Sequence, residues 1–192
     1  MELTKQVLEN HGACGECMYW YISNGEPTSV EETIEKLLAS DRHEKFGWSN
    51  WLLSHVLPND DKIRYAIFAA ELVIDIFEKE FPEDKRPRNA IEAAREYLSN
   101  KDVAVADAVY AEVVYAEARA DDARAAARAV AEVTYAACAD YADYAACAAA
   151  WAVIYATRAT DEADYVETYT KIINYGLSLV KKCDVHCCKT QD

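Results

Sequence analysis

The chain has 192 residues, of which 52% are hydrophobic and 28% are charged, and its formal net charge is -14. This length allows one compact core with at most a small appendage, and the acidic excess disfavours binding to duplex nucleic acid or anionic membranes. The longest apolar run, residues 65–77, is interrupted by Glu71 and Asp75 and is too short to span a bilayer. The N-terminus has no apolar segment typical of a signal peptide, so we expect a cytoplasmic protein.

The N-terminal half is predicted to form short helices joined by turns, because four of the five glycines and all four prolines precede residue 90. Ser29 and Glu32 have the spacing of a capping box, which predicts a helix start at Ser29. Asn59 or Asp60 should cap a longer helix that Pro82 ends, and Pro87 should lie in the first turn of the next one. The predicted helices cover residues 3–9, 16–22, 29–39, 47–57, 59–81 and 87–98.

Residues 103–163 have a different composition, with alanine at 26 of 61 positions and neither glycine nor proline. Alanine has the highest helix propensity, so this segment should be helical. One straight helix over residues 103–158 would be about 84 Å long, which is too long for a compact domain, so we expect at least one bend, with Asp121 or Asp122 as a possible cap. A last helix should run from Asp161 to Lys181.

A seam of apolar residues repeats at steps of three or four along the Ala-rich segment, through Val130, Val133, Ala137, Tyr141, Tyr144, Ala148, Trp151 and Tyr155. Such a seam joins helices either within one chain or across two chains, so an intramolecular bundle and a homo-oligomer both remain open. The fold class is therefore predicted as all-α, a bundle of short N-terminal helices with long Ala-rich C-terminal helices. Its parts are residues 1–100, 101–182 and a flexible tail, 183–192.

A cluster of cations stands out in this acidic chain: Lys85, Arg86, Arg88 and Arg95. The cations could simply pair with neighbouring carboxylates, because Glu92 lies at helical spacing from two of the arginines and Asp84 is close in sequence. Alternatively, cations beside the helix start that Pro87 fixes would form an anion site, since guanidinium groups and free backbone N–H groups both bind phosphate.

Aromatic side chains near this cluster could stack on a nucleobase. The candidates are Trp48 and Trp51, three residues apart on one predicted helix, together with Tyr65. Tryptophans at helical spacing also commonly belong to a core, so both roles remain open.

The seven cysteines are more typical of free thiols than of a disulfide framework. Cys14 and Cys17 have the spacing of half a zinc site, and the tail could supply further ligands, but the two segments come from opposite ends of the chain. No strand–helix–strand pattern that would support a thioredoxin-like role surrounds this pair. The four histidines are dispersed and none belongs to a known catalytic motif, so we expect no metal, no cofactor and no catalysis.

Residues 48–98 resemble a family of bacterial and phage proteins catalogued as immunity proteins. The motifs that carry the resemblance are WxxWLL from Trp48, YAIFAAE from Tyr65 and DKRPRNAIEAAR from Asp84. Cys14, Gly15 and Trp20 and the Ala-rich extension are also similar to phage-encoded members. The resemblance implies an all-helical fold and a role in conflict between phage and host.

These observations lead to two hypotheses of function. In the first, a phage-encoded, non-enzymatic protein sequesters a small anionic immune signal, such as a cyclic nucleotide; Arg86, Arg88, Arg95 and Lys85 would hold its phosphates while Trp48, Trp51 or Tyr65 stacks on its base. In the alternative, an acidic immunity protein or DNA mimic blocks a toxin, nuclease or defence protein through Asp121, Asp122, Asp140 and Asp143.

Overall fold

The computed structural model describes residues 2–101, 142–160 and 162–187, with a few separate positions between 125 and 136. Over these residues the chain is helical and has no strand, only one isolated bridge between Glu2 and Ser29. The predicted all-α class is therefore confirmed. Contacts divide the chain into a first unit, Met1–Val56 with Gly176–Asp192, and a second unit, Leu57–Tyr175. The compositional boundary predicted at residue 100 lies inside the second unit.

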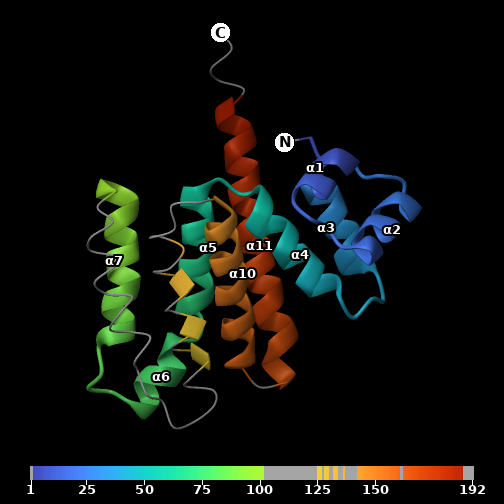
Figure 1. Ribbon diagram of the computed structural model, residues 1–192. Helices are drawn as coiled ribbons and strands as arrows, with labels where there is room; N and C mark the ends of the chain where they lie inside the picture. The colour runs from blue at the N-terminus through green and yellow to red at the C-terminus, as the bar shows by residue number, and fades with distance from the viewer. Residues whose placement is uncertain are drawn as a thin grey trace. The chain divides into compact units, whose positions relative to one another are not determined.

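The first unit contains four short helices close to the predicted ranges. They are α1 (Lys5–Asn10), α2 (Gly15–Ser23), α3 (Val30–Ala39) and α4 (Lys45–Val56) (Figure 1). Its core is formed by buried aromatic and aliphatic side chains, including Trp20, Tyr21 and Ile34. The Tyr21 hydroxyl lies 3.3 Å from the Leu3 carbonyl and 3.2 Å from the Pro27 carbonyl. This contact ties the N-terminal segment to the turn before α3.

The predicted capping pattern at Ser29 is confirmed. Ser29 is the N-cap of α3, and its hydroxyl accepts a hydrogen bond from the Glu32 backbone N–H at 3.1 Å. The Glu32 carboxylate accepts one from the Thr28 N–H at 3.3 Å, one residue before the partner that a capping box usually has. Two N–H groups that the helix itself cannot satisfy therefore have partners.

Ser29→Ala should lower the free energy of unfolding by about 1 kcal/mol, because the first turn of α3 loses its side-chain acceptor. Urea denaturation followed by circular dichroism measures this loss. Ser29→Asp is the matched control, since a carboxylate can accept the same hydrogen bond; it should keep most of the stability. Equal stability of the alanine and wild-type proteins would show that this cap contributes nothing.

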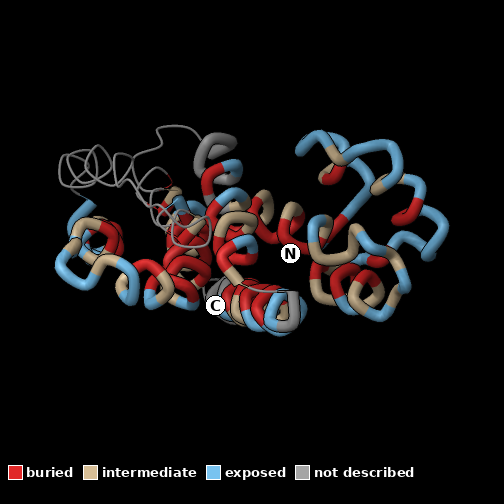
Figure 2. Tube along the Cα trace, turned by 90° about the horizontal axis from the view of Figure 1, so that it is seen from below, coloured by how far each residue is buried: buried red, intermediate tan, exposed pale blue. Residues whose placement is uncertain are grey.

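The second unit is built around α5 (Asn59–Glu71), followed by α6 (Ile74–Glu80) and α7 (Arg86–Asn100). α10 (Ala142–Arg158) packs along α5, and α7 packs on another side of it (Figure 1). The first part of α11 (Glu162–Cys187), up to Tyr175, completes this unit. α5 is buried on most sides as a result, and Figure 2 shows buried residues along the inner sides of the helices in each unit.

The single helix predicted between Asn59 and Pro82 is wrong, because the structure breaks it at Leu72 and Val73. The Val73 N–H bonds the Ala70 carbonyl, three residues back, and the Ile76 N–H bonds the Val73 carbonyl in the same tight pattern. Val73 and Ile74 are adjacent β-branched residues, which crowd the preceding turn of a helix and lower its propensity. The cap expected at Asn59 or Asp60 also differs, since Pro58 is the N-cap and Asn59 already lies in α5.

The buried face of α10 differs from the predicted seam. Ala148 is buried as expected, but Trp151 is 45% exposed, and the neighbours that face the core are Ala152 and Ala156, both fully buried. Small side chains allow α10 to approach α5 closely, whereas an indole at this contact would hold the two helices apart. The predicted caps Asp121 and Asp122 lie outside the described residues.

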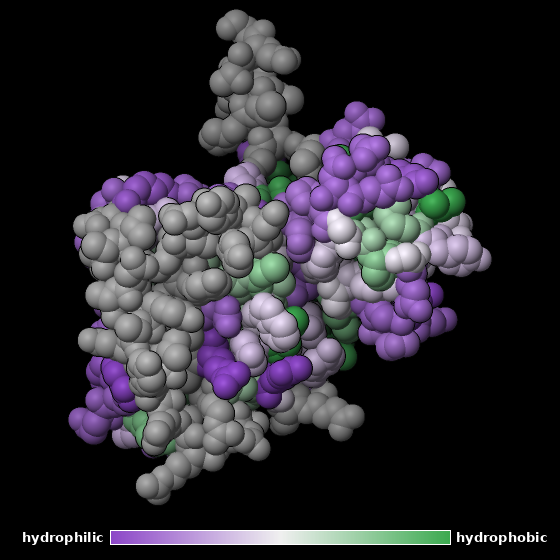
Figure 3. All heavy atoms as spheres, viewed as in Figure 1, coloured by the Kyte–Doolittle hydropathy of each residue, from purple (hydrophilic) through white to green (hydrophobic). Residues whose placement is uncertain are grey.

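The later helix boundaries largely follow the sequence. α7 starts at Arg86, so Pro87 lies in its first turn as predicted, and Lys101 ends it in a left-handed conformation with φ of 61°. α11 starts one residue after the predicted Asp161 and continues to Cys187, six residues beyond the predicted end. Among the described residues, every helix is too short or too polar to cross a bilayer. The described surface visible in Figure 3 is mostly hydrophilic, with scattered hydrophobic spots.

Candidate anion-binding pocket

A pocket of about 250 Å³ lies in the second unit beside α5. α5 supplies one face of side chains at spacings of three, one and three, and α7 supplies two more at a spacing of three. Tyr175 of α11 completes the lining, which consists of Arg64, Ile67, Phe68, Glu71, Arg95, Leu98 and Tyr175. Ligand pockets in proteins usually measure roughly 300–1,000 Å³, so this one suits a compact ligand.

One wall of the pocket is aromatic. The rings of Phe68 and Tyr175 stack with their centroids 4.2 Å apart and an interplanar angle of 13°. Burial raises the pKa of the Tyr175 hydroxyl, and the nearby Arg64 guanidinium opposes this rise. The tyrosine therefore stays neutral at physiological pH, with its hydroxyl beside a cation. Such a wall can contact the flat face or edge of a ligand ring.

Two arginines line the pocket, and each is held by a carboxylate of α5. Arg64 pairs with Asp61 at 2.9 Å, and Arg95 of α7 pairs with Glu71. The side chains of Arg64 and Arg95 are nevertheless 40% and 56% exposed. A guanidinium carries more N–H donors than one carboxylate uses, so both arginines retain donors for an anion. Glu71 also lines the pocket, which makes the net charge of the lining +1.

Arg86 and Arg88, two of the cations predicted to bind phosphate, are engaged in ion pairs. Arg86 donates to both carboxylate oxygens of Asp84, with Nη2 to Oδ2 at 2.5 Å, and lowers the pKa of that carboxyl. Arg88 donates from Nε and Nη2 to Glu78 of α6, at 2.6 Å each, and Asp75 lies 3.6 Å away. The pairing of Arg86 with Asp84 is one that the alternative of local pairing expected, whereas Arg88 pairs with Glu78 and not with Glu92, and this pair joins α7 to α6.

The other two predicted cations, Lys85 and Arg95, lie at different places on α7. Lys85 is the exposed N-cap of α7, and its charge helps to lower the pKa of Glu78, after the larger effect of Arg88. Arg95 alone of the four lines the pocket. Its carboxylate partner is Glu71 of α5, not the Glu92 neighbour considered from the sequence.

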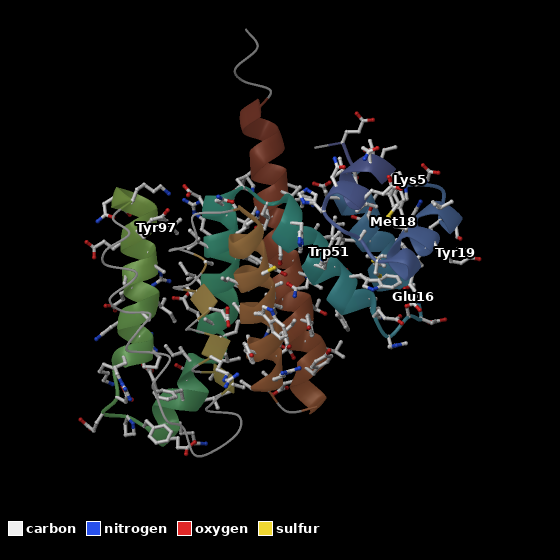
Figure 4. All side chains as sticks on the ribbon, in the orientation of Figure 1. Lys5, Glu16, Met18, Tyr19, Trp51 and Tyr97 are labelled. Atoms are coloured by element: carbon white, nitrogen blue, oxygen red, sulfur yellow. The ribbon has the colours of Figure 1, made fainter. Side chains whose placement is uncertain are left out.

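The tryptophans predicted to stack on a base lie in the first unit, whereas the cations lie in the second. Trp48 and Trp51, both on α4, line a cavity of about 20 Å³, which is room for about one water molecule. The centroid of the Trp48 ring lies 6.4 Å from that of Trp20 and 4.7 Å from the guanidinium carbon of Arg42. The ring centroids of Trp51 and His55 are 4.6 Å apart. Figure 4 shows Trp51 on α4. This cavity is too small for a nucleobase, which supports a core role for both indoles.

Tyr65 is fully buried in α5, where a ligand cannot reach it, so we remove it from the candidate site. Burial raises the pKa of its hydroxyl well above the usual range. The same stretch of sequence contains Arg64 and Phe68, which sequence reasoning missed. Helical spacing in the sequence could have indicated this face of α5. Steps of three, four and three separate the residues Asp61, Arg64, Phe68 and Glu71. In the structure they form a stripe of less buried residues on a helix that otherwise faces the core.

No group of three or more metal-ligating side chains occurs in the part of the chain that the structure describes. Of the acidic residues in the protein-binding alternative, Asp121, Asp122 and Asp140 lie outside the described residues, as does the side chain of Asp143. No family, curated protein or solved structure matches the chain.

Proposed function

We propose that this protein binds a small anionic molecule of the nucleotide class in the pocket of the second unit and holds it without chemical change. The observation that carries the proposal is the placement of Arg64 and Arg95 beside the stacked rings of Phe68 and Tyr175. Guanidinium forks suit phosphate oxygens, and an aromatic wall suits a base. The pocket thus offers both cations for the phosphate and an aromatic surface for the base.

The competing charges in the pocket define what kind of anion can enter. A ligand must share Arg64 with Asp61 and Arg95 with Glu71. An anion with a single acceptor oxygen would gain little from such shared contacts, whereas a phosphate group, including the phosphodiester of a cyclic nucleotide, offers more than one acceptor oxygen to the guanidiniums. Glu71 would repel an oxygen placed close to it, so the phosphate should lie toward the exposed sides of the two arginines.

The biological setting remains a proposal that comes from the family resemblance. In that setting the ligand is a cyclic nucleotide or similar signal of host defence, and the protein lowers its free concentration in the infected cell. Self-association through the Ala-rich helices belongs to the same proposal, and Trp151, 45% exposed beside Tyr155 on α10, supports it. Native mass spectrometry of the purified protein gives the number of subunits.

The proposal is tested by incubating the full chain with a panel of cyclic and linear nucleotides, removing free ligand by gel filtration, and heating the complex. Chromatography with mass spectrometry then identifies what is released. Return of intact nucleotide supports binding without catalysis, and an altered nucleotide would show an enzyme. Failure to retain any member of the panel at micromolar concentration would contradict the proposed function.

A further inference from the structure

Cys14 and Cys17 meet at the start of α2. Cys14 is the N-cap, with extended backbone dihedrals of -67° and 158°, and its sulfur accepts a hydrogen bond from the Cys17 backbone N–H at 3.3 Å. The Cys14 side chain is exposed. A negative charge on this sulfur would therefore be met by a backbone donor and by the positive end of the helix dipole.

Cys17 lies in a contrasting environment one turn later. It lines the small apolar cavity of the first unit with Trp20 and Trp48. Burial, followed by the proximity of Cys14, raises the pKa of its thiol to about 12. The two cysteines thus lie one turn apart, with Cys14 exposed to solvent and Cys17 half-buried.

We infer that Cys14 and Cys17 form a redox-active dithiol that exchanges with small disulfides and closes into an intramolecular disulfide. The Cys14 thiolate attacks one sulfur of a disulfide RSSR and forms a mixed disulfide, releasing RS⁻, which takes up a proton to become RSH. Cys17 then attacks the Cys14 sulfur, which breaks the mixed bond, and the Cys17 proton passes to the leaving RS⁻, which is released as a second RSH. Overall, two protein thiols and RSSR give one protein disulfide and two RSH.

The local geometry permits both steps. Residues three apart at a helix start lie within the Cα separation that a disulfide tolerates, about 4.4 to 6.8 Å. The Cys14 side chain is exposed, so a small disulfide in solution can reach its sulfur. Figure 4 shows that Glu16 and Met18, the neighbours of Cys17 in sequence, belong to the same helix. This chemistry does not need a surrounding strand–helix–strand pattern. The capping position of Cys14 and the partial burial of Cys17 come from α2 and the side chains packed against it.

Alkylation in glutathione redox buffers, followed by peptide mass spectrometry of the full chain, tests this inference. The wild-type protein should form a Cys14–Cys17 disulfide as the buffer becomes oxidising. Cys17→Ser should accumulate a mixed disulfide with glutathione on Cys14, because the resolving thiol is gone. In Cys14→Ser, Cys17 should react with iodoacetamide more slowly than Cys14 does in Cys17→Ser, because Cys17 is half-buried against the small cavity. Circular dichroism checks that each variant is folded.

Cys147→Ser is the matched control, because Cys147 is another exposed free thiol, and its loss should leave the Cys14–Cys17 disulfide unchanged. The inference is overturned if both thiols stay reduced in buffer that oxidises free dithiols, or if Cys17 is glutathionylated faster than Cys14. Stoichiometric zinc that is lost in Cys14→Ser would overturn it as well, because metal-bound thiolates would then explain the pair. None of these outcomes depends on nucleotide binding.

Discussion

Arg95→Ala should weaken binding of a nucleotide that the wild-type protein retains by tenfold or more. A charge-assisted hydrogen bond contributes about 1.5 to 3 kcal/mol, and each 1.4 kcal/mol changes affinity about tenfold. Arg64→Ala should have an effect of similar size, since both guanidiniums line the same pocket. Isothermal titration calorimetry on wild type and both variants, in buffer of one fixed salt concentration, measures the loss.

The most informative control for this loss is Arg88→Ala, which removes an arginine of α7 that is paired with Glu78. The affinity of this variant for the nucleotide should stay within about twofold of wild type. A twofold change corresponds to roughly 0.4 kcal/mol, which is about the uncertainty of such comparisons. Arg95→Lys adds a second control, because lysine keeps the charge but lacks the planar fork; it should bind more weakly than wild type and better than alanine. Unchanged affinity in both alanine variants of the pocket would show that the nucleotide binds elsewhere.

The elements of the fold were largely predictable from local signals. Ser29 with Glu32, and Pro87, each limit a helix through their own backbone chemistry, and both act where the sequence indicated. The break at Val73 was not predictable in the same way. It has no glycine or proline, and the apolar period continues through it from Ile67 to Phe77. The adjacent β-branched residues Val73 and Ile74 lower the helix propensity there, but this local signal is too weak by itself to place a break.

The candidate site was predictable only in part, because the partner of a charge depends on tertiary structure. Glu92 was a reasonable partner for Arg95 at helical spacing, yet the structure pairs Arg95 with Glu71, a residue 24 positions earlier on α5. Tyr65 and Phe68 are both aromatic residues in one short stretch, and their exposure differs because α5 turns one toward the core and the other toward the pocket. A helical wheel gives this difference once the neighbours of α5 are known.

Arg88→Ala is expected to lower the free energy of unfolding by about 1 to 2 kcal/mol at pH 7. The Arg88 side chain makes two hydrogen bonds of 2.6 Å with Glu78, and the two side chains are 42% and 22% exposed. Hydrogen bonds between charged groups contribute about 1.5 to 3 kcal/mol when well protected, and solvent screening at this exposure reduces that value. Urea denaturation of wild type and variant measures the difference.

The pH dependence of this loss identifies its origin. The hydrogen bond from Arg88 lowers the pKa of Glu78 below its usual value of about 4.5, so the folded state favours the charged carboxylate. The stabilisation is therefore complete above the unfolded pKa and declines as the pH falls through the lower folded pKa. The wild-type and Arg88→Ala proteins should accordingly differ in stability at pH 7, and the difference should shrink as the pH falls through the lowered pKa of Glu78. A double-mutant cycle with Glu78→Ala should assign most of the loss to this pair.

The same two measurements decide between the two roles that the sequence left open for Arg88. If Arg88→Ala lowers stability in this pH-dependent way and retains nucleotide, the arginine joins α7 to α6 and has no part in the anion site. If the variant is as stable as wild type at pH 7 but loses the nucleotide, the ion pair contributes nothing to the fold. Arg88 would then belong to the anion site, as the cluster of cations at the start of α7 first suggested.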